Sequence, residues 1–203
     1  MTQTVTALYD TYDAAVSAVN DLEASGIPHA NISLVSNNVD HRYDEDHPTN
    51  AAADAGTGAG IGAAVGGVGG LLTGLGLLAI PGVGPVVAGG WLVATAVGAV
   101  GGAVVGGAAG GIVGSLTGAG VPEHDANFYA EGVRRGGTLV TARVDDARAP
   151  GAREILQHRK WVDPTVRGAV YRESGWTSFD QSAPPYTPEQ VAAERNQYIG
   201  GGV

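Results

Sequence analysis

The chain of 203 residues contains no cysteine. Disulfide bonds, thiolate zinc sites and cysteine nucleophiles are therefore excluded. The sequence also lacks the GK[ST] ending of a phosphate-binding loop and the GxSxG pattern of a hydrolase nucleophile elbow. Its five histidines are scattered along the chain. We therefore predict no catalytic, cofactor-binding or metal-binding residues, no small-molecule substrate, and a protein that is not an enzyme.

Positive charge is scarce, because 11 Lys and Arg stand against 20 Asp and Glu, for a net charge of −9. Residues 1–54 hold nine acids and one arginine, a balance of −8, whereas residues 134–172 hold nine basic and four acidic residues, a balance of +5. The basic part could meet nucleic acid or anionic lipid. We favour the interpretation that the acidic and basic parts lie together in one domain and neutralise each other, because the overall acidic excess repels polyanions such as nucleic acid.

Charged side chains are also missing from the 67 residues between Ala55 and Val121, which include 24 glycines. Many of these glycines recur at every fourth position, in two series. The first series is Gly58, Gly62, Gly66, Gly70 and Gly74, and the second is Gly98, Gly102, Gly106, Gly110, Gly114 and Gly118. Residues four apart share one face of a helix, so each series predicts a helix with a groove free of side chains. The sequence Pro81 to Pro85 predicts a turn between them, and thus a helical hairpin.

This predicted hairpin requires a partner surface. Glycine destabilises a helix interior by about 1 kcal/mol relative to alanine, so an isolated hairpin in water would be penalised by roughly 20 kcal/mol. Small-xxx-small faces let helices approach closely, as is typical of helix pairs in lipid. Both arms would also be longer than the roughly 30 Å hydrocarbon core. Two interpretations remain open: insertion in or attachment to a membrane, and a soluble homo-oligomer or filament with hairpins packed against each other. The chain itself is the expected partner, and membrane lipid is a second candidate.

The flanking sequence predicts one small α+β domain. Val5 to Tyr9 favours a strand, and Asp10 or Thr11 is the expected N-cap of a helix formed by the next residues. Asn31 to Ser36 favours a second strand. Downstream, the patterns predict a helix over 122–137, a strand over 138–144, a helix over 150–160 and a strand over 166–171. This order predicts a ferredoxin-like sandwich, interrupted by the hairpin between its second and third strands.

The expected organisation has five parts. Residues 1–36 form the first βαβ half, 37–55 an acidic polar loop, 56–121 the glycine-rich and alanine-rich helical hairpin, 122–173 a helix plus the second βαβ half, and 174–203 a tail with a short helix. The histidines and carboxylates of the acidic loop match no closed metal site. Gly56 to Gly62 superficially fits a dinucleotide-binding loop, but no acid follows it until Glu123. The N-terminus lacks a signal peptide, which predicts a cytoplasmic domain, associated with the membrane in the first interpretation.

Several segments resemble known families. Residues 5–10, 20–28 and 31–35 look like the heat-induced stress protein YflT domain. Residues 120–125 and 128–140 are similar to bacterial general stress and low-temperature-induced proteins with a glycine-rich centre. The resemblance covers residues 1–36 and roughly 56–145 and implies a non-enzymatic bacterial stress-response protein. It carries no catalytic residue over to this chain.

Overall fold

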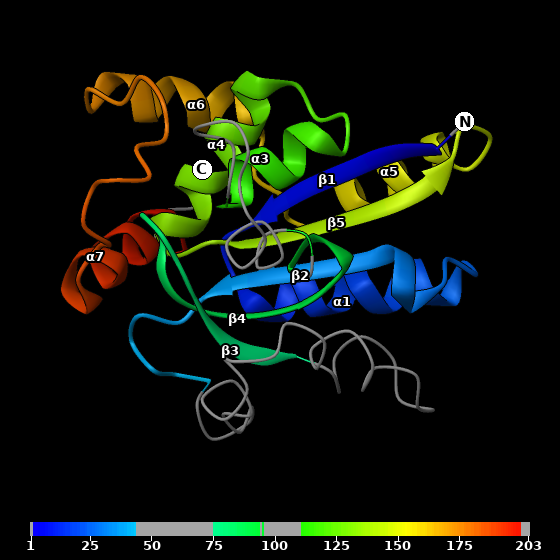
Figure 1. Cartoon of the computed structure of the whole chain (residues 1–203), viewed down its shortest axis with the longest axis horizontal. Coiled ribbons are helices and arrows are strands. Elements are labelled where there is room, and N and C mark those ends of the chain that lie inside the picture. The colour runs from blue at the N-terminus through cyan, green and yellow to red at the C-terminus, as the bar shows by residue number, and fades with distance from the viewer. Residues whose placement is uncertain (1, 44–74, 94, 96–110, 200–203) are drawn as a thin grey trace.

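The computed structural model describes residues 2–43, 75–93, 95 and 111–199. In these residues five antiparallel strands form one sheet in the order β1-β5-β2-β4-β3 (Figure 1). The strands are β1 (Thr2–Tyr9), β2 (Ile32–Asn37), β3 (Gly76–Ile80), β4 (Gly84–Gly90) and β5 (Thr138–Asp145). The α+β class is therefore confirmed.

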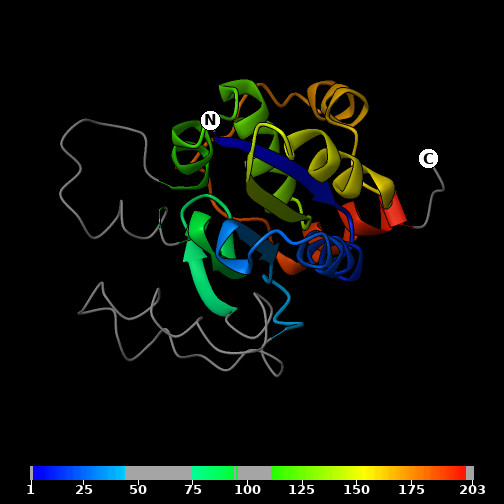
Figure 2. The same ribbon diagram turned by 90° about the vertical axis from the view of Figure 1, so that its right-hand side faces the viewer.

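Helices cover both faces of the sheet (Figures 1 and 2). They are α1 (Tyr12–Ala24), η1 (His29–Asn31), α3 (Gly111–Gly118), α4 (Glu123–Arg134), α5 (Ala149–His158), α6 (Pro164–Glu173) and α7 (Pro188–Ile199). Apolar residues of α1 and α5 pack with one face of the strands, and those of α3, α4 and α6 pack with the other. Alternation along the strands separates the two cores: Leu8 lies in the second, while its neighbours Ala7 and Tyr9 lie in the first.

The strand and helix expected at the N-terminus are present. Thr11 is the N-cap of α1, and its hydroxyl accepts a hydrogen bond from the Ala14 N–H at 3.3 Å. Strands β1 and β2 both pair with β5, which lies between them as it would in the predicted ferredoxin-like domain. The helix expected over 122–137 is α4, and the short helix expected in the tail is α7.

The fourth strand of that prediction is wrong. Residues 166–171 lie inside α6, which begins at Pro164. The carboxylate of Asp163 accepts hydrogen bonds from the N–H groups of Thr165 (2.7 Å) and Val166 (3.3 Å), so this residue caps the helix. Because the segment is helical and helices cover both faces of the sheet, the ferredoxin-like sandwich is not confirmed.

The predicted helical hairpin is wrong over residues 76–90. These residues form the two strands β3 and β4, which extend the sheet on the outer side of β2. The turn between them falls at 81–83, where a turn was predicted, and the Val83 N–H donates to the Ile80 carbonyl at 3.0 Å. Val86 and Val87 are both fully buried and lie in opposite cores, so the apolar residues here follow the period of a strand.

Strand β4 approaches β2 closely at its end. A Cβ on Gly90, whose φ is +92°, would lie 2.2 Å from the Ile32 carbonyl oxygen, so this position requires glycine. Beyond it, the Leu92 N–H donates to the Ser33 hydroxyl at 2.8 Å, and the Trp91 indole donates to the Asn31 carbonyl at 3.0 Å. These bonds fix the chain as it leaves the sheet. Among the residues that the structure describes, no helix has both the length and the apolar character needed to cross a membrane.

Candidate functional site

Two of the predicted helix-packing glycines lie in the described part of the chain. Gly114 and Gly118 belong to α3, whereas Gly58, Gly62, Gly66, Gly70, Gly74, Gly98, Gly102, Gly106 and Gly110 lie outside the described residues. Helix α3 packs onto the domain through its buried residues Ile112, Ser115 and Leu116. Gly118 is exposed, and a Cβ added there would meet no atom within 4 Å. Of the two, Gly118 at the end of α3 is therefore left uncovered by the described residues, whereas Gly114 is half-buried.

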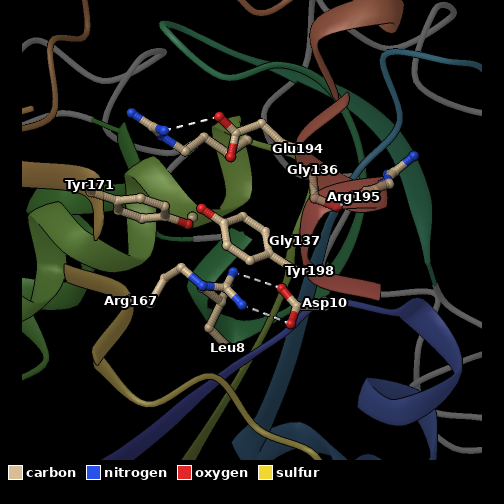
Figure 3. A pocket seen from close by; sticks show the side chains of 11 residues that line it. Leu8, Asp10, Gly136, Gly137, Arg167, Tyr171, Glu194, Arg195 and Tyr198 are labelled. Carbon is tan, nitrogen blue, oxygen red and sulfur yellow. Dashed lines mark hydrogen bonds and ion pairs between the residues drawn. The ribbon is translucent and has the colours of Figure 1, made fainter. Parts of the chain in front are cut away.

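The C-terminal tail forms the most elaborate polar cluster in the described residues, where α7 meets the ends of β1, β2 and α4 (Figure 3). Arg195 of α7 is only 8% exposed. Its Nε donates to the Gly136 carbonyl at 3.0 Å and its Nη2 donates to the Asn37 carbonyl at 3.2 Å. Its Nη1 pairs with the Asp40 carboxylate. One side chain thus ties the tail to the segments that follow β2 and α4.

Arg135, at the end of α4, holds a second part of this cluster. Its Nε donates to Glu131 at 2.7 Å and its Nη1 donates to Glu194 of α7 at 3.0 Å. Its guanidinium carbon lies 4.3 Å from the centre of the Tyr171 ring. Burial lowers the pKa of Arg135, but the hydrogen bond to Glu131 and the charges of Glu131 and Glu194 outweigh this and raise it. Burial raises the pKa of Glu194, and the opposing attraction of Arg135 is smaller.

Arg167 of α6 supplies the third part. It binds both carboxylate oxygens of Asp10, at 2.8 and 3.0 Å, in the fork geometry that makes such pairs strong. Its guanidinium carbon lies 3.3 Å from the centre of the Tyr198 ring of α7 (Figure 3). This bidentate pair joins the end of β1 to α6, and the stacked ring joins α7 to both.

The space between these side chains is a cavity of about 10 Å³, room for about one water molecule. Each of the three guanidiniums already binds carboxylates or backbone carbonyls. The arrangement is therefore suited to holding the tail against the domain, and it offers no volume for an organic ligand. The C-terminal tail thus covers its own domain.

A second hollow of about 590 Å³ opens between the start of α4, α6 and residues 176–178. Phe128, Arg172 and Trp176 line it together with the first residues of α4. His124 and Asp125 lie 3.0 Å apart here, and the histidine side chain is 84% exposed. Glu123 and Asp125 occupy the first turn of α4, where negative charge suits the helix dipole.

In the described residues, two ion pairs join the acidic and basic parts of the chain, which were predicted to neutralise each other. Arg159 pairs with Asp21 at 2.8 Å, and Arg167 pairs with Asp10. Within the described ranges, no group of three histidines or carboxylates is placed to hold a metal ion. Most of the acidic loop, including His47, lies outside those ranges.

Sequence reasoning missed the Arg135, Arg167 and Arg195 cluster. The only available signal was the coexistence of arginines and tyrosines in the tail and in the helices before it. Comparisons of the chain with models of protein families, with curated proteins and with solved structures found no match.

Proposed function

We propose that the chain is a non-enzymatic protein that associates with copies of itself through its glycine-lined segments, which the folded domain carries and spaces. The observation that supports this most is the orientation of α3. Its larger residues Ile112 and Leu116 are buried in the domain, while Gly118 faces open space. An exposed glycine at the end of a helix leaves room for the close approach of a second helix.

Chain lengths bear on the choice between the two settings proposed for this packing. There are 31 residues between Tyr43 and Leu75, and 17 between Val93 and Gly111. Both ends of each segment belong to the same folded domain, through β2, β3, the residues after β4, and α3. A helical crossing of a bilayer and a return would need about 40 residues. The lengths favour association between copies, with attachment to a lipid surface as the alternative to insertion across it.

The biological setting follows from the resemblance alone. Residues 1–36 and 56–145 resemble bacterial stress proteins, so the proposed role is a structural one in a bacterial stress response. Self-association through glycine faces fits this role because it requires no substrate or cofactor.

A triple substitution tests this proposal. Replacing Gly102, Gly106 and Gly110 by leucine blocks close approach of helices although it raises helix propensity. We expect the mass measured by light scattering in detergent-free buffer to fall to that of a smaller species. Replacement of the same three residues by alanine is the matched control, because alanine keeps the face small, and should leave the mass high.

Circular dichroism would verify that both variants keep the folded domain. Unchanged assembly of the leucine variant would refute the role of the glycine faces, as would a wild-type protein that is a uniform monomer. Flotation with anionic and with neutral vesicles would separate lipid attachment from association between copies.

A further inference from the structure

The hollow of about 590 Å³ between the start of α4, α6 and residues 176–178 has the size of a small-molecule site. Two aromatic side chains line it, and both are held by Tyr171 in the core. The ring of Phe128, which is 3% exposed, stacks on the Tyr171 ring with 5.6 Å between the centroids. The Trp176 ring meets the same tyrosine edge-on at 6.0 Å. The apolar wall of the hollow is therefore fixed in place.

Backbone and side-chain hydrogen bonds hold the loop that closes the hollow. Asn127 of α4 accepts a hydrogen bond from the Phe179 N–H at 3.0 Å, and its own amide donates to the Glu123 carbonyl at 2.8 Å. At the other end of the loop, the Trp176 N–H donates to the Tyr171 carbonyl of α6 at 3.0 Å. Residues 176–178 are thus tied to both helices. A site that is formed in advance binds its ligand at a lower cost in entropy.

Arg172 of α6 supplies the cation of the hollow, and it differs from the arginines of the tail cluster. Each of those arginines pairs with a carboxylate. No carboxylate of the described residues pairs with Arg172. Its guanidinium lies against its own helix, with Nη1 3.4 Å from the position of a Cβ added to Gly168. A guanidinium presents its N–H donors in a flat fork that fits a carboxylate, so Arg172 has an unused binding group at this wall.

Gly168 adjoins Arg172 in the wall of the hollow, and the fold does not require glycine there. The residue lies inside α6, where alanine would be more stable than glycine. An added Cβ would lie 3.4 Å from Arg172 Nη1 and 3.8 Å from Phe128 Cδ2, which are ordinary contact distances. Alanine would therefore fit, but its methyl group would take up the space between the guanidinium and the aromatic ring. Glycine keeps this space open at a cost in helix stability.

The acidic residues that line the hollow have other surroundings. Asp125 lies 3.0 Å from His124 Nε2, and Glu123 is exposed in the first turn of α4, where its charge suits the helix dipole. A cationic ligand would compete with the histidine and with the helix for these carboxylates. An anionic ligand would find Arg172 without a competitor. Charge complementarity therefore favours a ligand with one negative group and a flat apolar body.

We propose that this hollow binds a small aromatic carboxylic acid. Its carboxylate pairs with Arg172, and its ring lies against Phe128 and Trp176. The acid is bound and not converted, so no catalytic residue is needed. The lining residues include no glycine of either series, so binding does not require the chain to associate with copies of itself.

Three naphthalene probes test the proposal on the full-length protein in titrations followed by NMR of the probe. 2-Naphthoate, 2-naphthamide and 2-naphthylmethylamine share one apolar body and are anionic, neutral and cationic. We expect 2-naphthoate to bind with a Kd of about 1 mM or lower, as is typical of a ligand of this size. The other two probes should bind more weakly by about fivefold or more. Absence of 2-naphthoate binding, equal binding of all three probes, or tighter binding of the amine would overturn the proposal.

A pair of arginine variants locates the bound carboxylate. Arg172→Gln removes the charge and the flat fork, so it should weaken 2-naphthoate by about fivefold or more and leave 2-naphthamide unchanged. Arg153→Gln removes the same charge from the exposed side of α5 and is the matched control, which should bind as the wild type does. Equal losses in the two variants would assign the effect to net charge and overturn the site.

Gly168→Ala separates a ligand site from a purely structural role. We expect its melting temperature to rise, because alanine favours the helix, while 2-naphthoate binds about threefold more weakly or worse, because the methyl group fills the space beside Arg172. Gly151→Ala in α5, where an added Cβ meets no atom within 4 Å, is the control and should leave binding unchanged. Full binding by Gly168→Ala would show that the ligand does not use this space and would overturn the proposed placement.

Discussion

Replacing Arg195 by methionine should destabilise the protein severely, since this side chain joins the tail to the domain. Its guanidinium donates to the Gly136 and Asn37 carbonyls at 3.0 and 3.2 Å and pairs with Asp40. Breaking a buried ion pair by removing one partner destabilises by about 3–5 kcal/mol. Asp40 keeps a second partner, Arg42, at 2.8 Å. We therefore expect the free energy of unfolding to fall by about 3–4 kcal/mol, in the lower part of that range.

Urea unfolding followed by circular dichroism measures this change, with two comparison variants. Arg195→Lys keeps the charge but loses the planar fork that reaches three acceptors, so its loss should be intermediate. Arg153→Met on the exposed side of α5 changes the same residue type away from any such network, and should change stability by less than about 0.5 kcal/mol. Limited proteolysis should also release the tail faster from the Arg195 variant. A loss below about 1 kcal/mol for Arg195→Met would refute the view that this network holds the tail.

Two further predictions concern a helix contact and a titrating group. Gly132→Ala should destabilise by about 1–2 kcal/mol in the same unfolding assay, because the new Cβ would lie 2.3 Å from Leu8 Cδ2 and overpacking outweighs the gain in helix propensity. Gly151→Ala, which meets no atom within 4 Å, should be neutral or stabilising, and equal losses in the two variants would contradict the packing argument. Burial raises the pKa of Glu194 above 4.5, so the folded state binds this proton more tightly than the unfolded state. The contribution of this proton to stability is complete below about pH 4.5 and declines as the pH rises through the higher pKa of the folded state. Glu194→Gln should remove this decline when the free energy of unfolding is measured between about pH 4 and 7. An unchanged pH profile would exclude Glu194 as the source of the decline.

The elements that were predicted correctly carry clear local signals in the sequence. Strand β1, helix α1 and strand β2 were predictable because alternation, an N-cap at Thr11 and a proline before β2 act over a few residues. Helix α6 was mistaken for a strand because Val166 to Tyr171 is rich in β-prone residues. The local signal that decides the structure was present in Asp163 and Pro164, a capping residue followed by proline at the first helical position.

The β3–β4 hairpin shows how a strong periodic pattern can be extended too far. Neither glycine series has a member between Gly74 and Gly98, so the four-residue period stops before β3 begins. In that interval, larger apolar residues flank a turn that contains Gly82 and Gly84, and this pattern is a hairpin signal. The two glycines have φ values of +76° and +98° in the structure. The two series were assigned to a single helical hairpin because the uncharged composition continues through the interval.

The tail cluster was beyond the reach of sequence patterns. Arg167 and Asp10 are 157 positions apart in the chain, and Arg195 and Asp40 are 155 apart. Charge balance predicted that the two halves would neutralise each other, but composition cannot assign partners. The choice depends on where α6 and α7 lie relative to the sheet, and this follows from apolar packing around Tyr171 and Val191, which are nearly or fully buried.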